Sequence, residues 1–251
     1  ASSISVAQTT ICDGDMASLS VTGGSLGTGA NWEWYSGSCG GTSVGSGTSI
    51  SVSPSTTTTY YVRAEGTCNN TACVSVTITV NPIPTPSITS RSADLCVGET
   101  VNLTGTPTGG TWTVTSGPGS IATDVLTATG SGTINLEYEV TTSGCTGTET
   151  QAITVNPSGD ASWSSPGTVC ESAGTVDLDA LVTGDAGGTW SGTGVTGSTF
   201  DPTGQNGNTI TITYSVGGAC PDAVDHDITV DNAVTATWTQ PSAICESEAP
   251  I

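Results

Sequence analysis

The sequence predicts an all-β protein made of tandem β-sandwich domains, and three observations support this fold class. Glycine is abundant, with 34 in 251 residues, and short runs that alternate apolar and polar residues are separated by Gly-rich turns. No segment has the 3.6-residue periodicity of an amphipathic helix. The tripeptide Ile-Thr-Val recurs at Ile78, Ile153 and Ile228, which gives a constant period (153 − 78 = 228 − 153 = 75). A fixed period indicates one folded unit repeated along the chain.

The period divides the chain into three complete repeats and the start of a truncated fourth repeat: residues 1–81, 82–156, 157–231 and 232–251. In the last segment Trp238 precedes Cys245 by seven residues (245 − 238 = 7). In the third repeat Trp163 precedes Cys170 by the same interval (170 − 163 = 7). We therefore expect this chain to be a segment of a longer array.

The elements follow the same order in every repeat. An entry strand leads to a cysteine, then come an alternating strand, a tryptophan strand, a tyrosine strand, a second cysteine and the final Ile-Thr-Val strand. The tyrosine strands are TYYVRA, TINLEYEV and TITITYSV, and the tryptophan strands are NWEWY, GGTWTV and GGTWSG. About seven short strands in a repeat of this size are typical of a two-sheet immunoglobulin-like sandwich. We expect the tandem sandwiches to form a rod.

The tryptophans fall into two groups with different expected positions. Trp34, Trp112 and Trp190 recur at one place in the repeat, so we expect them to pack between the two sheets of their sandwich. Trp163 and Trp238 lie in entry strands, where we expect them to pack at junctions between repeats. An exposed tryptophan would instead favour stacking on sugar rings, which is what a glycan-binding function needs.

The charge composition excludes several partners. The chain has no Lys, and its two cationic residues, Arg63 and Arg91, are outnumbered by 22 acidic residues, so the formal net charge is −20. Nucleic acids are bound through Lys and Arg, so we expect no nucleic-acid partner, and an anionic membrane surface is excluded for the same reason. No apolar run approaches the roughly 18 residues of a membrane span, so we expect no membrane insertion in this segment.

Nine cysteines without a Cys-x-x-Cys pair, in a chain with a single His, do not match a zinc or redox site. They indicate disulfides and therefore an oxidising compartment, so we expect an extracellular protein. No signal peptide is recognisable, and we expect the export signal to lie outside this segment.

The spacing of the cysteines suggests disulfides within repeats. Alignment on the tyrosine strands makes Cys68, Cys145 and Cys220 equivalent, because they follow a tyrosine by 7, 7 and 6 residues (68 − 61, 145 − 138 and 220 − 214). The expected pairs are Cys12–Cys68, Cys96–Cys145 and Cys170–Cys220, with Cys39–Cys73 as an extra pair in the first repeat and Cys245 unpaired in this segment.

A geometric conflict keeps a second disulfide arrangement open. In an immunoglobulin-like sandwich, the turn after the first strand and the turn before the last strand lie at opposite poles, beyond the reach of a disulfide. Either the first strand is placed differently, or the disulfide joins one repeat to its neighbour. Pairing within repeats is the favoured hypothesis because each repeat carries both halves, although spacing alone does not fix connectivity.

Three stretches of the first repeat, TYYVRAEGTC, WEWYSGSCGG and SPSTTTT, carry a family resemblance. They resemble the immunoglobulin-like repeats of Bacteroidota surface proteins. The later repeats, with GGTW and a cysteine after the tyrosine strand, look like the looser relatives found beside them, including polycystic-kidney-disease-like repeats. The resemblance implies a cell-surface location, type IX secretion and no catalytic residues. Such repeats occur in giant adhesins, gliding-motility filaments and stalks of secreted enzymes.

Candidate catalytic residues are sparse. Two stretches match Gly-x-Ser-x-Gly, around Ser25 and Ser43, but a nucleophile elbow needs a strand-to-helix turn that this sequence does not predict. His226, the only candidate general base, lies far along the chain from both serines. We therefore expect no enzymatic activity.

Acidic residues offer a weak case for calcium. They gather in CDGD, with Asp13 and Asp15, and at the end of the third repeat, in Asp222, Asp225, Asp227 and Asp231. Carboxylates at a domain junction can bind calcium and stiffen a rod. No EF-hand spacing is present, so the favoured interpretation is solvated acids and no cofactor, with structural calcium as the alternative.

The favoured function is mechanical. Tandem disulfide-stapled sandwiches with short, proline-marked junctions suit a structural spacer in a long cell-surface adhesin or filament, whose partners are neighbouring repeats of the same chain. One alternative is a glycan- or protein-binding module that uses the small-residue segment 36–49 of the first repeat. Another is a self-assembling fibre subunit that pairs through edge strands or a donated strand.

Overall fold

The computed structural model describes residues 1–90, 94–232 and 238–239, and these are β-structure apart from one short 3-10 helix. They divide into two compact units, residues 1–155 and 156–251. Most of the expected fourth repeat, including Cys245, lies outside the described residues. In the described part of the chain, no helix is long and apolar enough to cross a membrane.

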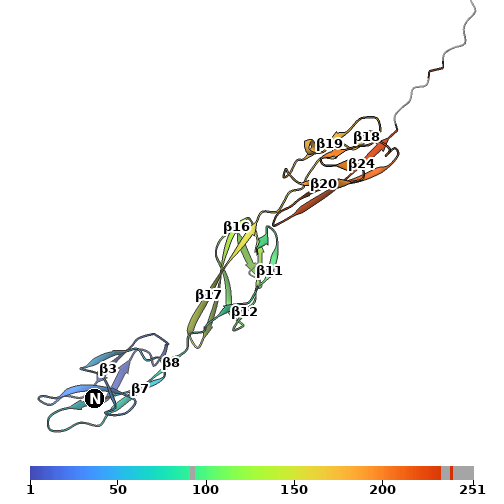
Figure 1. Ribbon diagram of the computed structural model, residues 1–251. Helices are drawn as coiled ribbons and strands as arrows, with labels where there is room; N and C mark the ends of the chain where they lie inside the picture. Colours follow the sequence, from blue (N-terminus) through green and yellow to red (C-terminus); the bar gives the residue numbers. More distant parts are fainter. Residues whose placement is uncertain (91–93, 233–237, 240–251) are drawn as a thin grey trace, which may run out of the picture. The chain divides into compact units, whose positions relative to one another are not determined.

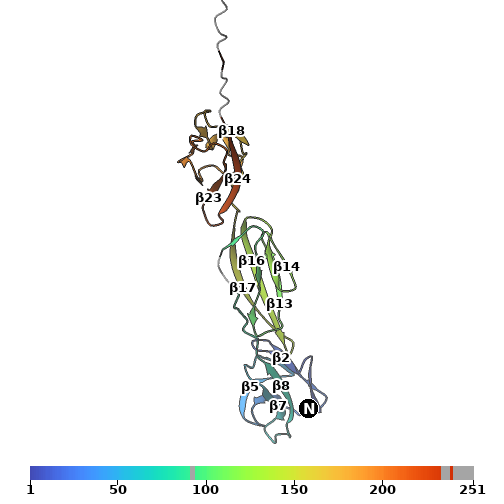
Figure 2. The ribbon, with the colours of Figure 1, turned by 90° about the vertical axis from the view of Figure 1, so that its right-hand side faces the viewer.

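The first unit begins with a sandwich whose two sheets both come from residues 3–81. One sheet has the order β1-β3-β6 and the other β2-β8-β7-β4-β5. The strands are β1 (Ser3–Val6), β2 (Thr10–Cys12), β3 (Ala17–Thr22), β4 (Asn31–Ser36), β5 (Thr42–Ser46), β6 (Ser49–Val52), β7 (Thr58–Glu65) and β8 (Val74–Asn81). Alternate residues of β7 face inward, and Leu19, Trp34, Val62 and Ile78 are fully buried between the sheets. Figure 2 shows β2, β5, β7 and β8 gathered in this sandwich.

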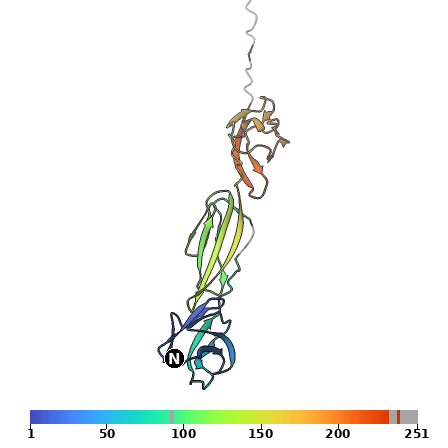
Figure 3. The same cartoon turned by 90° about the vertical axis from the view of Figure 1, so that its left-hand side faces the viewer.

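The same unit contains a second sandwich. One sheet has the order β10-β17-β16-β13, a second has the order β11-β15-β14, and β9 pairs with β12. The strands are β9 (Ser87–Ile88), β10 (Leu95–Cys96), β11 (Thr100–Asn102), β12 (Gly105–Thr106), β13 (Thr111–Ser116), β14 (Gly119–Ala122), β15 (Val125–Ala128), β16 (Gly132–Thr142) and β17 (Cys145–Asn156). The long hairpin of β16 and β17 dominates it (Figures 1 and 3). Its core includes Leu126, Ile134, Leu136 and Ile153.

The second unit is a sandwich with sheets β18-β24-β23-β20 and β19-β22-β21. Its elements are β18 (Thr168–Cys170), β19 (Val176–Asp177), the 3-10 helix η1 (Asp179–Leu181), β20 (Thr189–Gly192), β21 (Val195–Thr196), β22 (Thr199–Phe200), β23 (Thr209–Val216) and β24 (Asp222–Asp231). Phe200, Ile212, Tyr214 and Ile228 are fully buried in its core. Its larger sheet is labelled by β18, β20 and β24 in Figure 1.

One sheet order recurs in all three sandwiches: cysteine strand, last strand, tyrosine strand, tryptophan strand. The cysteine strands β2 and β18 pair in parallel with the last strands β8 and β24. In the first sandwich the preceding strand β1 pairs with the opposite sheet, so the opening segment of the chain is shared between both sheets. The predicted fold class of tandem immunoglobulin-like β-sandwiches is confirmed.

The three equivalent tryptophans are not all buried between the sheets as expected. Trp34 is fully buried as predicted, whereas Trp112 and Trp190 are half-buried and lie against the rings of Tyr138 and Tyr214, with centroids 4.3 and 4.4 Å apart. Both tyrosines are almost fully buried.

The expectation that Trp163 packs at a junction between repeats is wrong. Trp163 is buried in the core of the second unit, because its short entry segment bridges to Val182 and turns the indole inward, edge-on to Trp190. Trp238 is 78% exposed.

The structure explains why both glycines stand in the Gly-Gly-Thr-Trp motif. In each copy the first glycine, Gly109 or Gly187, has a positive φ that only glycine adopts readily. The second glycine packs on the tyrosine ring, because a Cβ at Gly110 or Gly188 would lie 2.7 Å from it. Its backbone N–H also donates to the tyrosine hydroxyl, at 3.1 and 2.9 Å.

Candidate functional site: a disulfide between two sandwiches

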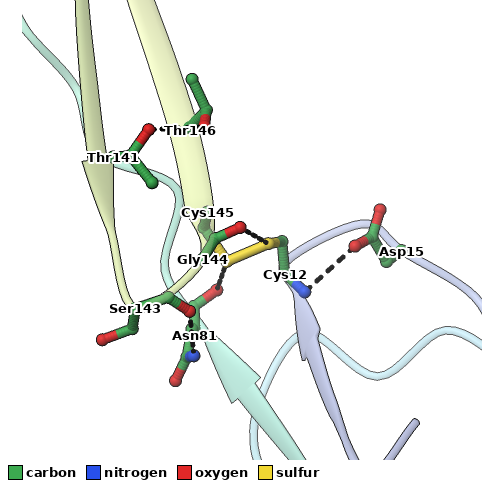
Figure 4. Close-up of a disulfide and its surroundings, with 8 residues drawn as sticks. All are labelled: Cys12, Asp15, Asn81, Thr141, Ser143, Gly144, Cys145 and Thr146. Carbon is green, nitrogen blue, oxygen red and sulfur yellow. Dashed lines mark hydrogen bonds between the residues drawn. A yellow bond between two sulfur atoms is a disulfide. The ribbon is translucent and has the colours of Figure 1, made fainter.

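Cys12 is held beside the end of the last strand of the first sandwich. It is the final residue of β2 and pairs with Asn81, the final residue of β8. The N–H of Asp13 donates to the Asn81 carbonyl over 3.0 Å, which extends the pairing by one step. Cys12 and Asp15 then form a reciprocal turn, in which each backbone N–H donates to the other residue, at 3.1 and 3.0 Å. These bonds hold the backbone of Cys12, whose sulfur lies beside the hairpin turn at Gly144 (Figure 4).

Cys145 lies at the tip of the hairpin in the second sandwich. The hairpin pairs from Gly132 and Val155 to Thr142 and Cys145 without a register shift. A two-residue turn, Ser143 and Gly144, closes it with φ values of 52° and 82°. Two positive φ values match the type I′ turn, whose twist suits a tight hairpin. The side chain of Cys145 is almost fully buried.

A disulfide joins Cys12 to Cys145, with 5.6 Å between their Cα atoms and a sequence separation of 133. Next to it the Asn81 side-chain amide donates to the Ser143 carbonyl over 2.9 Å. The link therefore connects the first cysteine of the first sandwich to the hairpin cysteine of the second, and a polar contact supports it (Figure 4).

This link overturns the expected pairs Cys12–Cys68 and Cys96–Cys145. Cys68 and Cys170 are exposed free thiols, so the expected Cys170–Cys220 pair is also wrong. Cys96 and Cys220 are each disulfide-bonded. Cys39 and Cys73, paired in the sequence-based expectation, do form a disulfide.

The distance between the two ends of a sandwich explains why the expected disulfides between the start and hairpin cysteines of one repeat do not form. Cys170 pairs with Asp231 at the end of β24, whereas Cys220 lies just before the start of this strand, which is 10 residues long. At a rise of about 3.3 Å per residue, the two ends of the strand are about 30 Å apart, whereas a disulfide needs Cα atoms within about 7 Å. The two cysteines of one sandwich therefore cannot reach each other, and the alternative of a link to the neighbour is correct for Cys12.

The segment between the two sandwiches passes close to the hairpin. It contains Pro82, Pro84 and Pro86, which limit its backbone freedom. A Cβ on Gly147 would lie only 1.9 Å from the Pro84 carbonyl oxygen, so β17 and this segment touch backbone to backbone. The glycine allows the connecting segment to lie beside the disulfide.

Replacing Gly147 by alanine is expected to destabilise the second sandwich by about 1–3 kcal/mol, because the connecting segment must move away from β17. Chemical denaturation measures the change. Gly27→Ala is the matched control, since a Cβ there meets nothing within 4 Å. Equal effects of the two substitutions would contradict the role of close backbone contact.

The other disulfide in the first sandwich adjoins a charged cluster. Arg63 forms an ion pair with Glu65 at 2.7 Å and lies 5.2 Å from the centre of the Tyr35 ring. The Tyr35 hydroxyl donates to Glu65, and Cys39 Sγ lies 3.8 Å from an Arg63 nitrogen. The cluster ties the Cys39 turn to the sheet formed by β4 and β7.

The pKa shifts in this cluster follow from its contacts. Hydrogen bonds from the Tyr35 hydroxyl and then from Arg63 lower the pKa of the Glu65 carboxyl. The bond to Glu65 raises the pKa of Tyr35, and also that of Arg63. Ionised Glu65 is thus the form that the folded sandwich prefers.

A carboxyl whose pKa is lowered by folding contributes stability that is present above its unfolded pKa and lost as the pH falls through its folded pKa. We expect the melting temperature of the first sandwich to fall on acidification below the ordinary Glu range, and Glu65→Gln to flatten this fall. Calorimetry between pH 7 and pH 2 measures both. Glu33→Gln serves as the control on the adjacent strand, and an unchanged acid slope in Glu65→Gln would contradict the prediction.

The remaining candidate residues do not form a site. Ser25 lies in the loop between β3 and β4, and Ser43 lies within β5, so neither sits at a strand-to-helix turn. His226 lies in β24 and packs edge-on against Trp163. The segment 36–49, which carries the alternative of a binding module, is partly the strand β5.

The acidic residues named as calcium candidates accept separate hydrogen bonds. Asp15 accepts the Cys12 N–H, Asp222 accepts the Ala161 N–H, and Asp227 accepts the Thr211 hydroxyl. Among the residues that the structure describes, no three His, Cys, Asp or Glu side chains are grouped so that they could hold a metal ion.

Comparison with known proteins finds a family match for the first part of the chain and several similar solved structures. Residues 1–82 match the model of a family described as "Ig-like domain CHU_C associated". None of the curated proteins matches the sequence. Similar solved structures include an I-band fragment of titin, at 10% identity, with 92% of this chain and 99% of that chain covered and a TM-score of 0.43. The N-terminal eight Ig domains of Down Syndrome Cell Adhesion Molecule are also similar, at 10% identity, with 92% and 36% covered and a TM-score of 0.48. Drosophila OTK extracellular domains 3–5 match at 12% identity, with 93% and 98% covered and a TM-score of 0.35.

Proposed function

We propose that the chain is a spacer segment of a long extracellular adhesin or filament at the cell surface. Tandem Ig-like domains with disulfides suit a structural or adhesion module in general. The observation that carries the more specific proposal is the Cys12–Cys145 disulfide, because a covalent link between two sandwiches has a use wherever the chain must resist extension.

The proposal includes three repeats, at residues 1–81, 82–156 and 157–231, as one part of a longer rod-like array. The common sheet order of the three sandwiches and the 75-residue period support this division. The strongly acidic composition adds mutual repulsion, which keeps neighbouring surface chains apart. The match of residues 1–82 to an Ig-like family is compatible with the Bacteroidota surface repeats and type IX export that the sequence resembles.

The size of the parent protein tests the spacer proposal. Surface material sheared from the source cells is resolved on a denaturing agarose gel and detected with an antibody against this segment. The spacer function predicts a band far above the 24.8 kDa of the chain. A single band near the mass of the chain itself would rule the proposal out.

A second candidate function is glycan binding by the third repeat. A surface depression of about 380 Å³ there is lined by Trp190, Asp179, Thr189 and Ser198, and the Trp190 indole donates to Asp179 over 2.8 Å. An aromatic face beside hydroxyl and carboxylate groups is the chemistry that stacks on and hydrogen-bonds a sugar ring. Binding on a glycan array that disappears in Asp179→Asn and persists in Asp177→Asn would favour this function over a spacer.

A further inference from the structure

The two cysteines that recur in each repeat occupy two structural positions, which we name the start position and the hairpin position. The start position, at the end of the cysteine strand, holds Cys12, Cys96 and Cys170. The hairpin position lies between the tyrosine strand and the last strand for Cys68 and Cys220, and at the first residue of the last strand for Cys145. The observed link joins a start position to the hairpin position of the following repeat.

Start positions share their backbone geometry as well as their place in the sequence. Cys170 pairs in parallel with Asp231, just as Cys12 pairs with Asn81. The next N–H, that of Glu171, donates to Asp231 over 3.0 Å, the same distance as in the first repeat. Cys170 is therefore held beside the end of its sandwich as Cys12 is, but its thiol is exposed and free.

Cys96 carries the same local turn. Its N–H donates to the Glu99 carboxylate and its carbonyl accepts the Glu99 N–H, both at 3.0 Å, which repeats the reciprocal turn of Cys12 and Asp15. Cys12 and Cys170 thus lie on a backbone fixed at the end of the sandwich from which the chain leaves, and Cys96 has the same local turn as Cys12.

We propose that the disulfides follow one rule along the array: each start cysteine bonds to the hairpin cysteine of the following repeat. The rule pairs Cys96 with Cys220, both of which are disulfide-bonded. It makes Cys170 the attachment point for the hairpin cysteine of a following Ig-like repeat, and Cys68 the attachment point for the start cysteine of a preceding one. The free state of these two thiols fits the rule, because their partners would belong to other repeats. The inference concerns cysteine chemistry and holds whether the repeats act as a spacer or as a binding module.

The bond-forming step is thiol–disulfide exchange. A thiolate at Cys170 attacks an oxidised low-molecular-weight disulfide such as glutathione disulfide and releases one reduced thiol. The hairpin thiolate then attacks this mixed disulfide and releases the second reduced thiol. Two protein thiols thereby lose two electrons and two protons, and one disulfide oxidant is reduced to two thiols.

Peptide mapping tests the rule in the chain itself. Free thiols are blocked with N-ethylmaleimide at mildly acidic pH and the protein is cut with pepsin at low pH, because two arginines give trypsin too few sites and acid suppresses exchange. The rule predicts linked peptides for Cys12–Cys145 and Cys96–Cys220, with Cys68 and Cys170 alkylated. Peptides that link Cys96 to Cys145, or Cys170 to Cys220, would overturn it. In Cys220→Ser, Cys96 should become alkylated, whereas Cys170→Ser should leave both predicted links intact.

The attachment points are tested with a second copy of the chain as the neighbouring repeat. In a Cys245→Ser background, Cys68→Ser keeps only the start thiol Cys170, and Cys170→Ser keeps only the hairpin thiol Cys68. Mixed in a glutathione redox buffer, the two variants should form a heterodimer through Cys170 and Cys68 at several times the yield of either homodimer. Random pairing of an equimolar mixture gives the heterodimer at about twice the yield of either homodimer, so a ratio no higher than this, or no dimer, would overturn the assignment of Cys68 and Cys170.

Discussion

Replacing Trp34 by alanine is expected to destabilise the first sandwich by about 3–5 kcal/mol. The side chain is fully buried between the two sheets, where it belongs to the same core cluster as Leu19 and Val62. Its indole N–H donates to the Gly47 carbonyl over 2.9 Å, so the substitution removes a hydrogen bond as well as packing. Small domains are stable by only about 5–15 kcal/mol, so this loss is a large part of the total.

Chemical denaturation followed by circular dichroism measures the effect, with calorimetry to separate the transition of the first sandwich from the others. Trp238→Ala is the control, because that indole is 78% exposed and its removal should change stability by less than about 0.5 kcal/mol. Trp112→Ala, at a half-buried ring lying on Tyr138, should fall between the two. A Trp34→Ala variant as stable as Trp238→Ala would contradict the core assignment.

The sandwich fold was predictable because its signals are local. Period-two alternation in β7, β16 and β23 places every second residue in the core, and the structure buries those residues. The 75-residue repeat then transfers each assignment from one sandwich to the next. Local signals of this kind do not show how deeply a residue is buried, and for this reason the equivalent tryptophans differ in burial. Trp34 belongs to the core of its own sandwich, whereas Trp112 and Trp190 are half-buried and lie against the buried rings of Tyr138 and Tyr214.

The disulfide connectivity was not predictable from spacing, because alignment shows which cysteines are equivalent and says nothing about which ones meet. Pairing within a repeat and pairing with the next repeat use the same positions. The parallel register of Cys170 with Asp231 decides between them, since it places Cys170 and Cys220 at opposite ends of β24. That register requires the opening segment of the repeat to be shared between the two sheets. No residue pattern in the sequence predicts this sharing.

Removing the Cys12–Cys145 link is expected to lengthen the fully stretched chain between residues 1 and 156 by about 360 Å, at up to about 3.6 Å for each residue released. The link spans a sequence separation of 133, of which the intact Cys39–Cys73 disulfide still bridges 34 (133 − 34 = 99). With the disulfide intact, tension passes from Cys12 directly to Cys145, so only the short flanking segments 1–12 and 145–156 extend. Without it, this sequence separation becomes extensible except for the part that the Cys39–Cys73 disulfide bridges. The intact link thus shields most of two sandwiches from extension, and force can strip only β1, β2 and β17 from their sheets.

Single-molecule pulling from handles at Ala1 and Asn156 measures this length in the full chain and in Cys12→Ser. With these attachment points, the expected increase in stretched length does not depend on whether Cys96 and Cys220 are linked. The chain path between the handles through such a link is longer than the direct path, so the direct path limits the extension. Cys68→Ser is the control, since it removes an exposed free thiol and should leave the stretched length unchanged. A length that is the same in Cys12→Ser and in the oxidised chain would mean that the disulfide bears no load, and the shielding of two sandwiches would have to be abandoned.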